Sequence, residues 1–166
     1  MPTGALAEPE HLKAGRRPLL FDTSVLIPMI RGDAYERLFF RSLRSGRARM
    51  SSVVMQELYA GARAGADKKN LDGINRAFAG RGYLVTPDHD DWISAGIILA
   101  RYQHRHGNVK PRHHVNDILI LLGAARCEAA LVTENAAEMM RWRRMTRGAY
   151  KGLKVFGVRR AEWRDS

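Results

Sequence analysis

The chain has 166 residues, which is the length of one domain and is sufficient to bury a hydrophobic core. Hydrophobic residues make up 45% of it, which argues against disorder, and its single cysteine excludes an intramolecular disulfide. The net charge of +11 favours a polyanionic partner, above all a nucleic acid; an acidic protein partner and a merely solubilising surface are the alternatives.

Residues 18–160 are expected to form one domain between a flexible tail over 1–17 and a C-terminal tail over 161–166. No run approaches the roughly 18 apolar residues of a membrane span, and residues 1–17 lack the hydrophobic core of a secretory signal. With a lone cysteine, these features favour a reducing, cytoplasmic compartment and no membrane partner. Cys127 lies in an apolar stretch and is expected to be a small core residue rather than a nucleophile.

Hydrophobic periodicity predicts strands that alternate with helices along the domain. Short apolar runs predict strands at 18–21, 48–50, 83–86, 130–133 and 153–158. Apolar residues at helical spacing predict helices at 23–31, 34–45, 53–64, 67–79, 87–106, 115–126 and 134–142, with a loop over 107–112. This alternation indicates an α/β fold with a mainly parallel sheet.

Acidic and polar residues lie close to the ends of these predicted strands. Asp22 follows the first strand directly, Glu57 lies one turn into the helix after the second strand, and Asp117 lies near the start of a later helix. Residues 133–135 bring further polar groups to the end of the fourth strand. Sites in parallel sheets gather at the carboxyl ends of the strands, so we expect these oxygen atoms to converge. Clustered carboxylates repel one another and are tolerated around a hard cation such as Mg²⁺.

Each acid also has a plainer interpretation. Asp22 would serve as a helix cap, Glu57 as a solvent-facing helix residue, and Asp117 as a first-turn acid favoured by the helix dipole. The joint placement of the three acids, rather than any one of them, therefore carries the prediction of a metal site.

Four segments, in this order, resemble the motifs of the PIN-domain family, and specifically the VapC-type toxins of type II toxin–antitoxin systems. The segments are LFDTSVLI at 20–27, SSVVMQEL at 51–58, VNDILI at 115–120 and LVTEN at 131–135. The resemblance extends from about Leu19 to Val158, nearly the whole chain. It implies a three-layer α/β/α sandwich with a mainly parallel central sheet.

The resemblance also implies which residues form the site. Asp22, Glu57 and Asp117 are the metal-binding acids, and Asn135 stands where many members carry a fourth catalytic acid. The implied cofactor is Mg²⁺, with Mn²⁺ as a substitute. The remaining candidates for a fourth ligand or for positioning a water molecule are Glu134, Glu138, Thr133 and Ser24. For the two hydroxyl residues, helix capping is the rival role.

The implied function is that of a Mg²⁺-dependent endoribonuclease that hydrolyses RNA phosphodiester bonds, as the toxin of a toxin–antitoxin pair. The implied partners are an RNA substrate, a cognate antitoxin protein that lies across the acidic groove, and a second copy in a homodimer. The alternative is a catalytically weak or inactive RNA-binding module on the same fold, for which Asn135 leaves room.

Two other enzyme classes are disfavoured. A haloacid-dehalogenase-type phosphatase needs a second acid two residues after the first, and that position is Ser24. A dinucleotide-binding fold needs a glycine-rich turn after the first strand, which this sequence lacks.

Two basic segments flank the predicted acids. The first, over 101–114, immediately precedes Asp117, and its Arg112 and His113 are candidate RNA ligands. A solvated helix end and loop is the alternative for this segment. A zinc site is disfavoured because the spacing fits no zinc motif and no cysteine supports it; its ligands would be His104, His106, His113 and His114.

The second basic segment follows the fourth motif and supplies three further candidate RNA ligands, Arg141, Arg143 and Arg144. Trp142 lies among them and is expected to pack in the interior rather than to stack on a base.

Overall fold

The computed structural model describes residues 15–164, so most of the expected N-terminal tail and the last two residues lie outside the described residues. Its central sheet has five strands in the order β3-β2-β1-β4-β5, and all neighbouring strands are parallel. The strands are β1 (Leu19–Phe21), β2 (Ala48–Ser51), β3 (Leu84–Val85), β4 (Ala130–Thr133) and β5 (Lys154–Gly157). The predicted α/β fold with a parallel sheet is therefore confirmed.

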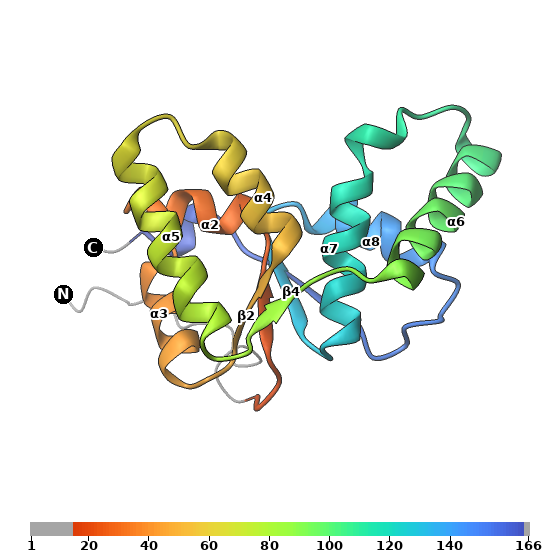
Figure 1. Ribbon diagram of the computed structural model, residues 1–166. Helices are drawn as coiled ribbons and strands as arrows, with labels where there is room; N and C mark the ends of the chain where they lie inside the picture. Colours follow the sequence, from red (N-terminus) through yellow and green to blue (C-terminus); the bar gives the residue numbers. More distant parts are fainter. Residues whose placement is uncertain (1–14, 165–166) are drawn as a thin grey trace.

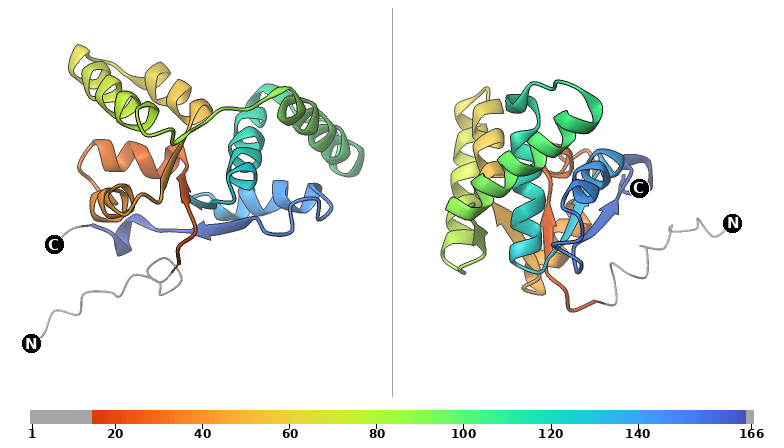
Figure 2. Two further views of the ribbon diagram at one scale, coloured as in Figure 1. Left: turned by 60° about the horizontal axis from the view of Figure 1, so that its bottom comes forward. Right: turned by 90° about the vertical axis from the view of Figure 1, so that its right-hand side faces the viewer.

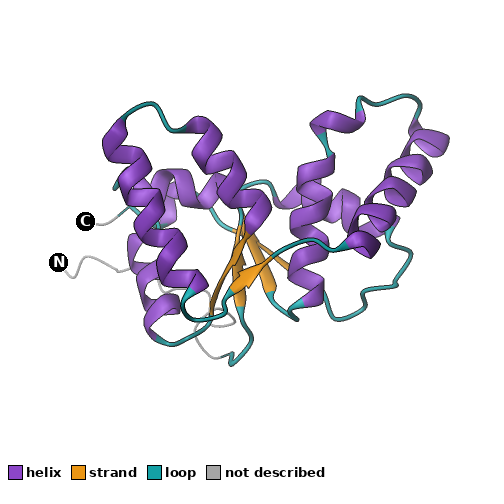
Figure 3. Ribbon diagram, in the orientation of Figure 1, coloured by secondary structure: helices purple, strands orange, loops and turns teal. Residues whose placement is uncertain are grey.

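Two groups of helices lie on opposite sides of the sheet, which confirms the three-layer sandwich (Figures 1 and 3). The first group is α2 (Thr23–Ile30), α3 (Glu36–Arg44), α4 (Ser52–Gly61) and α5 (Gly65–Ala79). The second is α6 (His89–His106), α7 (Val115–Arg126) and α8 (Ala136–Met145). Two short 3₁₀ helices are η1 (Pro111–His113), inside the expected loop, and η2 (Arg160–Glu162). Among the described helices, none has the length and apolar character that crossing a bilayer requires.

The central strands are buried on both faces, as expected for a parallel sheet covered by helices. Every residue of β1 and β4 is buried, whereas the edge strand β5 is partly exposed. Leu20 of β1 pairs with Arg49 of β2 on one side and with Leu131 of β4 on the other. The helices that follow β1 and β4 cover opposite faces, so the order of strands reverses between these two strands. Such a reversal, which we call the switch point of the sheet, opens space for a ligand beyond the carboxyl ends of β1 and β4.

A glycine allows β5 to lie close to the first turn of α8, next to that same end of the sheet (Figure 2). Gly157 pairs with Thr133 at the end of β4. A Cβ atom at this position would lie 2.9 Å from the Cβ of Ala136, which is closer than carbon atoms normally approach. A residue without a side chain is therefore needed here for α8 to start directly after the end of β4.

Several details of the elements differ from the prediction. Helix α3 begins at Glu36 rather than at residue 34, because Tyr35 has a left-handed φ of 69°. Helix α8 begins at Ala136 rather than at Glu134 and extends to Met145. Cys127 is half-buried against the core rather than fully inside it.

The packed part of the chain continues beyond residue 160, where the C-terminal tail was expected to begin. Trp163 is buried, and its ring centroid lies 6.4 Å from that of the buried Tyr35. The indole therefore fills space beside the corner between α2 and α3, and the domain includes it.

Candidate active site

Asp22 lies at the end of β1, and hydrogen bonds hold its carboxylate in place. Its Oδ1 accepts a bond of 2.8 Å from the backbone N–H of Thr23, which caps α2. Its Oδ2 accepts bonds of 2.7 Å from the hydroxyls of both Ser24 and Thr133. The side chain is only 4% exposed. Asp22 thus has both expected roles: it caps α2, and it presents an oriented carboxylate at the switch point of the sheet.

The two hydroxyls that bind Asp22 are themselves fixed by the loop after β4. The backbone N–H of Glu134 donates to the Oγ of Ser24 at 3.0 Å, and that of Asn135 donates to the Oγ1 of Thr133 at 2.9 Å. Because each hydroxyl oxygen accepts an N–H, its own proton is free to point at the carboxylate. Ser24 and Thr133 therefore orient Asp22, and this loop is tied to the end of β1.

Glu57 is held between the two layers of helices. The hydroxyl of Thr23 donates to its Oε2, and the side-chain amide of Asn116 donates to its Oε1 at 2.8 Å. Helix α4, which carries Glu57, packs against both α2 and α7. Both carboxylate oxygens thus have partners from other segments, so Glu57 is half-buried at the junction of the layers rather than simply solvent-facing.

Asp117 lies in the first turn of α7, next to the Asn116 that binds Glu57. Burial, followed by the negative charges of Glu138, Asp22 and Glu57, raises the pKa of Asp117 from 3.8 to about 7. Charges shift the pKa of a neighbouring carboxyl group only over short distances. The structure therefore brings together the three acids that the sequence singled out, from β1, α4 and α7.

The three acidic or amide candidates for a fourth ligand face different surroundings. Glu134 accepts hydrogen bonds from the Tyr35 hydroxyl and from the guanidinium of Arg160, which occupies both carboxylate oxygens. The Asn135 side chain is exposed and forms no capping bond to α8. Glu138, in the first turn of α8, is the one whose charge acts on Asp117.

His114 joins this group, although the sequence pattern pointed to it only as part of a four-histidine zinc site. One ligand atom from each of His114, Asp117 and Glu138 lies within 4.8 Å of the others. The signal available in the sequence was weak: His114 and Asp117 are three residues apart at the start of one helix, a spacing that places side chains together.

The predicted RNA-binding side chains are mostly at the surface. Four of them are exposed: Arg112, His113, Arg141 and Arg144. The fifth, Arg143, is half-buried, and its Nε donates to the carbonyl of Leu153 at 3.0 Å. Arg143 thus fixes the segment before β5 and is a poorer candidate for contacting RNA. Trp142 is fully buried, which confirms that it packs in the interior.

The donor set suits a hard divalent cation. The hydrogen-bond partners of Asp22 and Glu57 are hydroxyl, backbone and amide groups rather than lysine or arginine. The charges that raise the pKa of Asp117 are all carboxylates. Concentrated negative charge with oxygen lone pairs is what Mg²⁺ or Mn²⁺ requires.

The family model of the PIN domain matches residues 19–141, which is most of the chain, so the protein belongs to the PIN domain family. The match includes Asp22, Glu57, Asp117 and Asn135. A search of curated proteins found no match.

Solved structures share the fold at low sequence identity. DNA-bound VapBC from Salmonella typhimurium is 22% identical, with a TM-score of 0.58, over 85% of this chain and 98% of that chain. VapBC2 from Rickettsia felis, bound to a DNA fragment from its promoter, is 18% identical over the same shares, with a TM-score of 0.59. VapBC-1 from nontypeable Haemophilus influenzae is 16% identical over 84% and 96%, with a TM-score of 0.54. At these identities the likeness establishes the fold.

Without a bound cation, Asp117 destabilises the folded state whenever it is ionised. Its pKa is about 7 in the folded chain, against an ordinary value of 3.8, so the folded state binds more protons between these two values. The destabilisation grows as the pH rises above the ordinary value and is complete above the folded pKa. We expect Asp117→Asn to raise the free energy of unfolding at alkaline pH by about 1–2 kcal/mol, because water screens part of the repulsion at this partly exposed group.

This gain should disappear at a pH below the ordinary value of the carboxyl group, where Asp117 is protonated in both the folded and the unfolded wild type. Urea denaturation of wild type and Asp117→Asn in EDTA, at mildly alkaline and at acidic pH, measures the difference. A variant that is less stable than wild type at alkaline pH would contradict the assignment of electrostatic repulsion at this site.

Proposed function

We propose that the protein is an endoribonuclease that depends on Mg²⁺, with Mn²⁺ as a substitute, and that it acts as the toxin of a toxin–antitoxin pair. The observation that carries the proposal is the meeting of Asp22, Glu57 and Asp117 at the switch point of the sheet. RNA is itself negatively charged, so a protein that only bound RNA would gain nothing from a cluster of carboxylates. A cation between protein and phosphate makes the cluster useful.

The residues of the chain have distinct roles in this proposal. A divalent cation, when bound, polarises phosphate oxygens and lowers the pKa of a water molecule. Asp22, Glu57 and Asp117 would hold the cation through their carboxylates, while Ser24 and Thr133 keep Asp22 correctly oriented. These bonds restrict the carboxylates before substrate arrives, which reduces the reorganisation needed for reaction.

An inactive RNA-binding module is the second candidate, because Asn135 replaces an acid. Glu138 is the proposed replacement, because its charge acts on Asp117 from the first turn of α8. With four acids near one point, a catalytic site is the better supported of the two functions.

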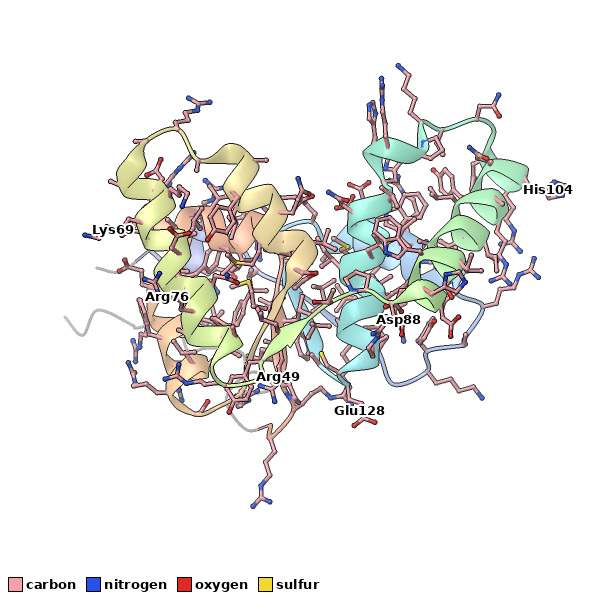
Figure 4. All side chains as sticks on the ribbon, viewed as in Figure 1. Arg49, Lys69, Arg76, Asp88, His104 and Glu128 are labelled. Carbon is pink, nitrogen blue, oxygen red and sulfur yellow. The ribbon has the colours of Figure 1, made fainter. Side chains whose placement is uncertain are left out.

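Cleavage of a structured RNA tests the catalytic site. We expect Mg²⁺-dependent cleavage that Asp22→Asn or Glu57→Gln lowers at least about 100-fold, because each removes a charged ligand. Glu128→Gln is the matched control, since Glu128 is exposed and precedes the amino end of β4, away from the carboxyl ends of the strands (Figure 4). Cleavage that persists in EDTA or in Asp22→Asn would refute the proposal, and tight binding without cleavage would favour the inactive module.

The exposed arginines of η1 and of the last turn of α8 are proposed to contact the RNA backbone. We expect Arg112→Ala with Arg144→Ala to weaken RNA binding and to reduce the slope of log K against log salt by about 0.7 for each phosphate that the chain no longer neutralises. Lys69→Ala with Arg76→Ala removes the same charge from α5, in the other layer (Figure 4), and should leave the slope unchanged. Fluorescence anisotropy in EDTA measures both. An equal weakening of binding in the two pairs would mean that net charge alone drives binding.

A cognate antitoxin is proposed to bind the apolar pocket next to the acids. Its apolar lining comes from Ile27, Ile30, Leu58 and Leu71, and its charged lining residues are Glu57, Asp67, Arg31 and Arg63. A partner segment that filled this pocket with apolar side chains would place a neighbouring arginine beside Glu57, where it competes with the cation. The VapBC structures that share the fold are complexes, which supports a partner of this kind.

Homodimerisation is proposed to occur through α6. Three of its large apolar side chains are about half exposed: Trp92, Ile93 and Ile97. The helix has acids in its first turn and basic residues in its last turn. Two antiparallel copies would therefore pair opposite charges at both ends of an apolar contact, as a two-fold symmetric interface requires.

The two proposed surfaces can be separated by two glutamate variants, studied alone and with the cognate antitoxin. We expect Ile93→Glu to sediment as a monomer that still binds the antitoxin. Ile30→Glu should remain a dimer and lose the antitoxin, because a charge in an apolar pocket is poorly solvated. Each variant serves as the control for the other. Sedimentation velocity would reject either surface if its variant behaved like wild type.

A further inference from the structure

The imidazole of His114 faces two carboxylates at the outer edge of the acidic cluster. Its Nδ1 lies 3.5 Å from the Oε1 of Glu138, and ligand atoms of His114, Asp117 and Glu138 lie within 4.8 Å of one another. His114 ends the segment before α7, Asp117 is in the first turn of that helix, and Glu138 is in the first turn of α8. Two helix starts thus bring three potential ligands to one point.

The Nδ1 atom is buried and has no hydrogen-bond partner among the described residues. A buried nitrogen without a partner is unfavourable and is uncommon in folded proteins. A cation bound by Nδ1 and by the neighbouring carboxylates would satisfy the nitrogen and reduce the repulsion between Asp117 and Glu138.

Contacts between tilted aromatic rings restrict the orientation of this imidazole. The ring of His114 lies 5.1 Å from that of Trp142, which in turn lies 4.9 Å from the ring of Tyr102 in α6. Trp142 is fully buried, so this row of rings is anchored between α6 and α8. A ligand that is held in place before the metal arrives binds it with less loss of conformational freedom.

The mixed donor set indicates which ions would bind. Mg²⁺ prefers oxygen ligands only, whereas imidazole suits transition metals, which also accept carboxylates. Nitrogen and oxygen ligands lie about 2.0–2.2 Å from such ions, so ligand atoms around one ion are about 3–4 Å apart. The present spread within 4.8 Å would close around one ion through small rotations of the side chains.

We propose that His114, Asp117 and Glu138 form a second cation site, which takes transition-metal ions of the Mn²⁺ class in preference to Mg²⁺. The site shares Asp117 with the proposed Mg²⁺ site, and to that extent it rests on the proposed function. A carboxylate between two ions would let both face the same phosphate group, an arrangement that two-metal nucleases use.

Pulsed electron paramagnetic resonance of the full chain loaded with Mn²⁺ tests the proposal directly, because it detects a coordinated imidazole nitrogen. We expect nitrogen modulation in wild type, its loss in His114→Gln, and its retention in His113→Gln. His113 is the matched control, as an exposed histidine next in sequence. Calorimetric titration should show the affinity for Mn²⁺ at this site falling at least about tenfold in His114→Gln, with the affinity for Mg²⁺ little changed.

Glu138→Gln should also weaken the nitrogen signal, which gives a second variant if His114→Gln does not fold. Asp22→Asn should abolish cleavage but keep the signal, since Asp22 belongs only to the first site. Wild-type chain that binds Mn²⁺ without nitrogen modulation overturns the second site, whatever the nuclease assays show. A nitrogen signal in a chain that cleaves no RNA would instead support this site and reject the proposed function.

Discussion

Electrostatic repulsion among carboxylates at one end of a parallel sheet is the constraint around which this fold is arranged. Two of these carboxylates are fixed by hydrogen-bond donors: Asp22 by Ser24 and Thr133, and Glu57 by Thr23 and Asn116. Those bonds prevent the acids from turning away from one another toward water. The unfavourable charge density is therefore retained in the folded chain and becomes available to attract a cation.

The order of strands explains why acids so distant in sequence meet. Because β1 and β4 are neighbours whose following helices lie on opposite faces, the loops beyond them separate and leave their ends accessible. Helix α4 starts from the next strand, and α7 runs back beside it, so Glu57 and Asp117 reach the same point. The short loop from β4 to α8 then supplies the backbone N–H groups that orient the hydroxyls.

Most of the architecture could be predicted because it depends on local pattern. Buried strands are continuous apolar runs, amphipathic helices repeat every three to four residues, and Asp22 follows its strand directly. Long-range contacts were not predictable in this way. Tyr35 adopts a left-handed backbone conformation where the chain turns beside Trp163. Glu134 lies before the start of α8 and accepts a hydrogen bond from Arg160, 26 residues later in the sequence. His114 was missed for the same reason, since its partner Glu138 comes from another helix.

The turn that includes Arg160 and Trp163 has a practical consequence for work with this protein. Arg160 donates a hydrogen bond to Glu134, whose backbone N–H donates to Ser24. Trp163 packs against Tyr35. The carboxyl-terminal turn therefore stabilises the loop after β4 that orients Asp22. Trimming the chain before this turn, or joining a purification handle directly to it, would loosen that loop without altering any acidic residue. Expression vectors for enzymatic work should therefore place the handle at the other end or after a flexible spacer.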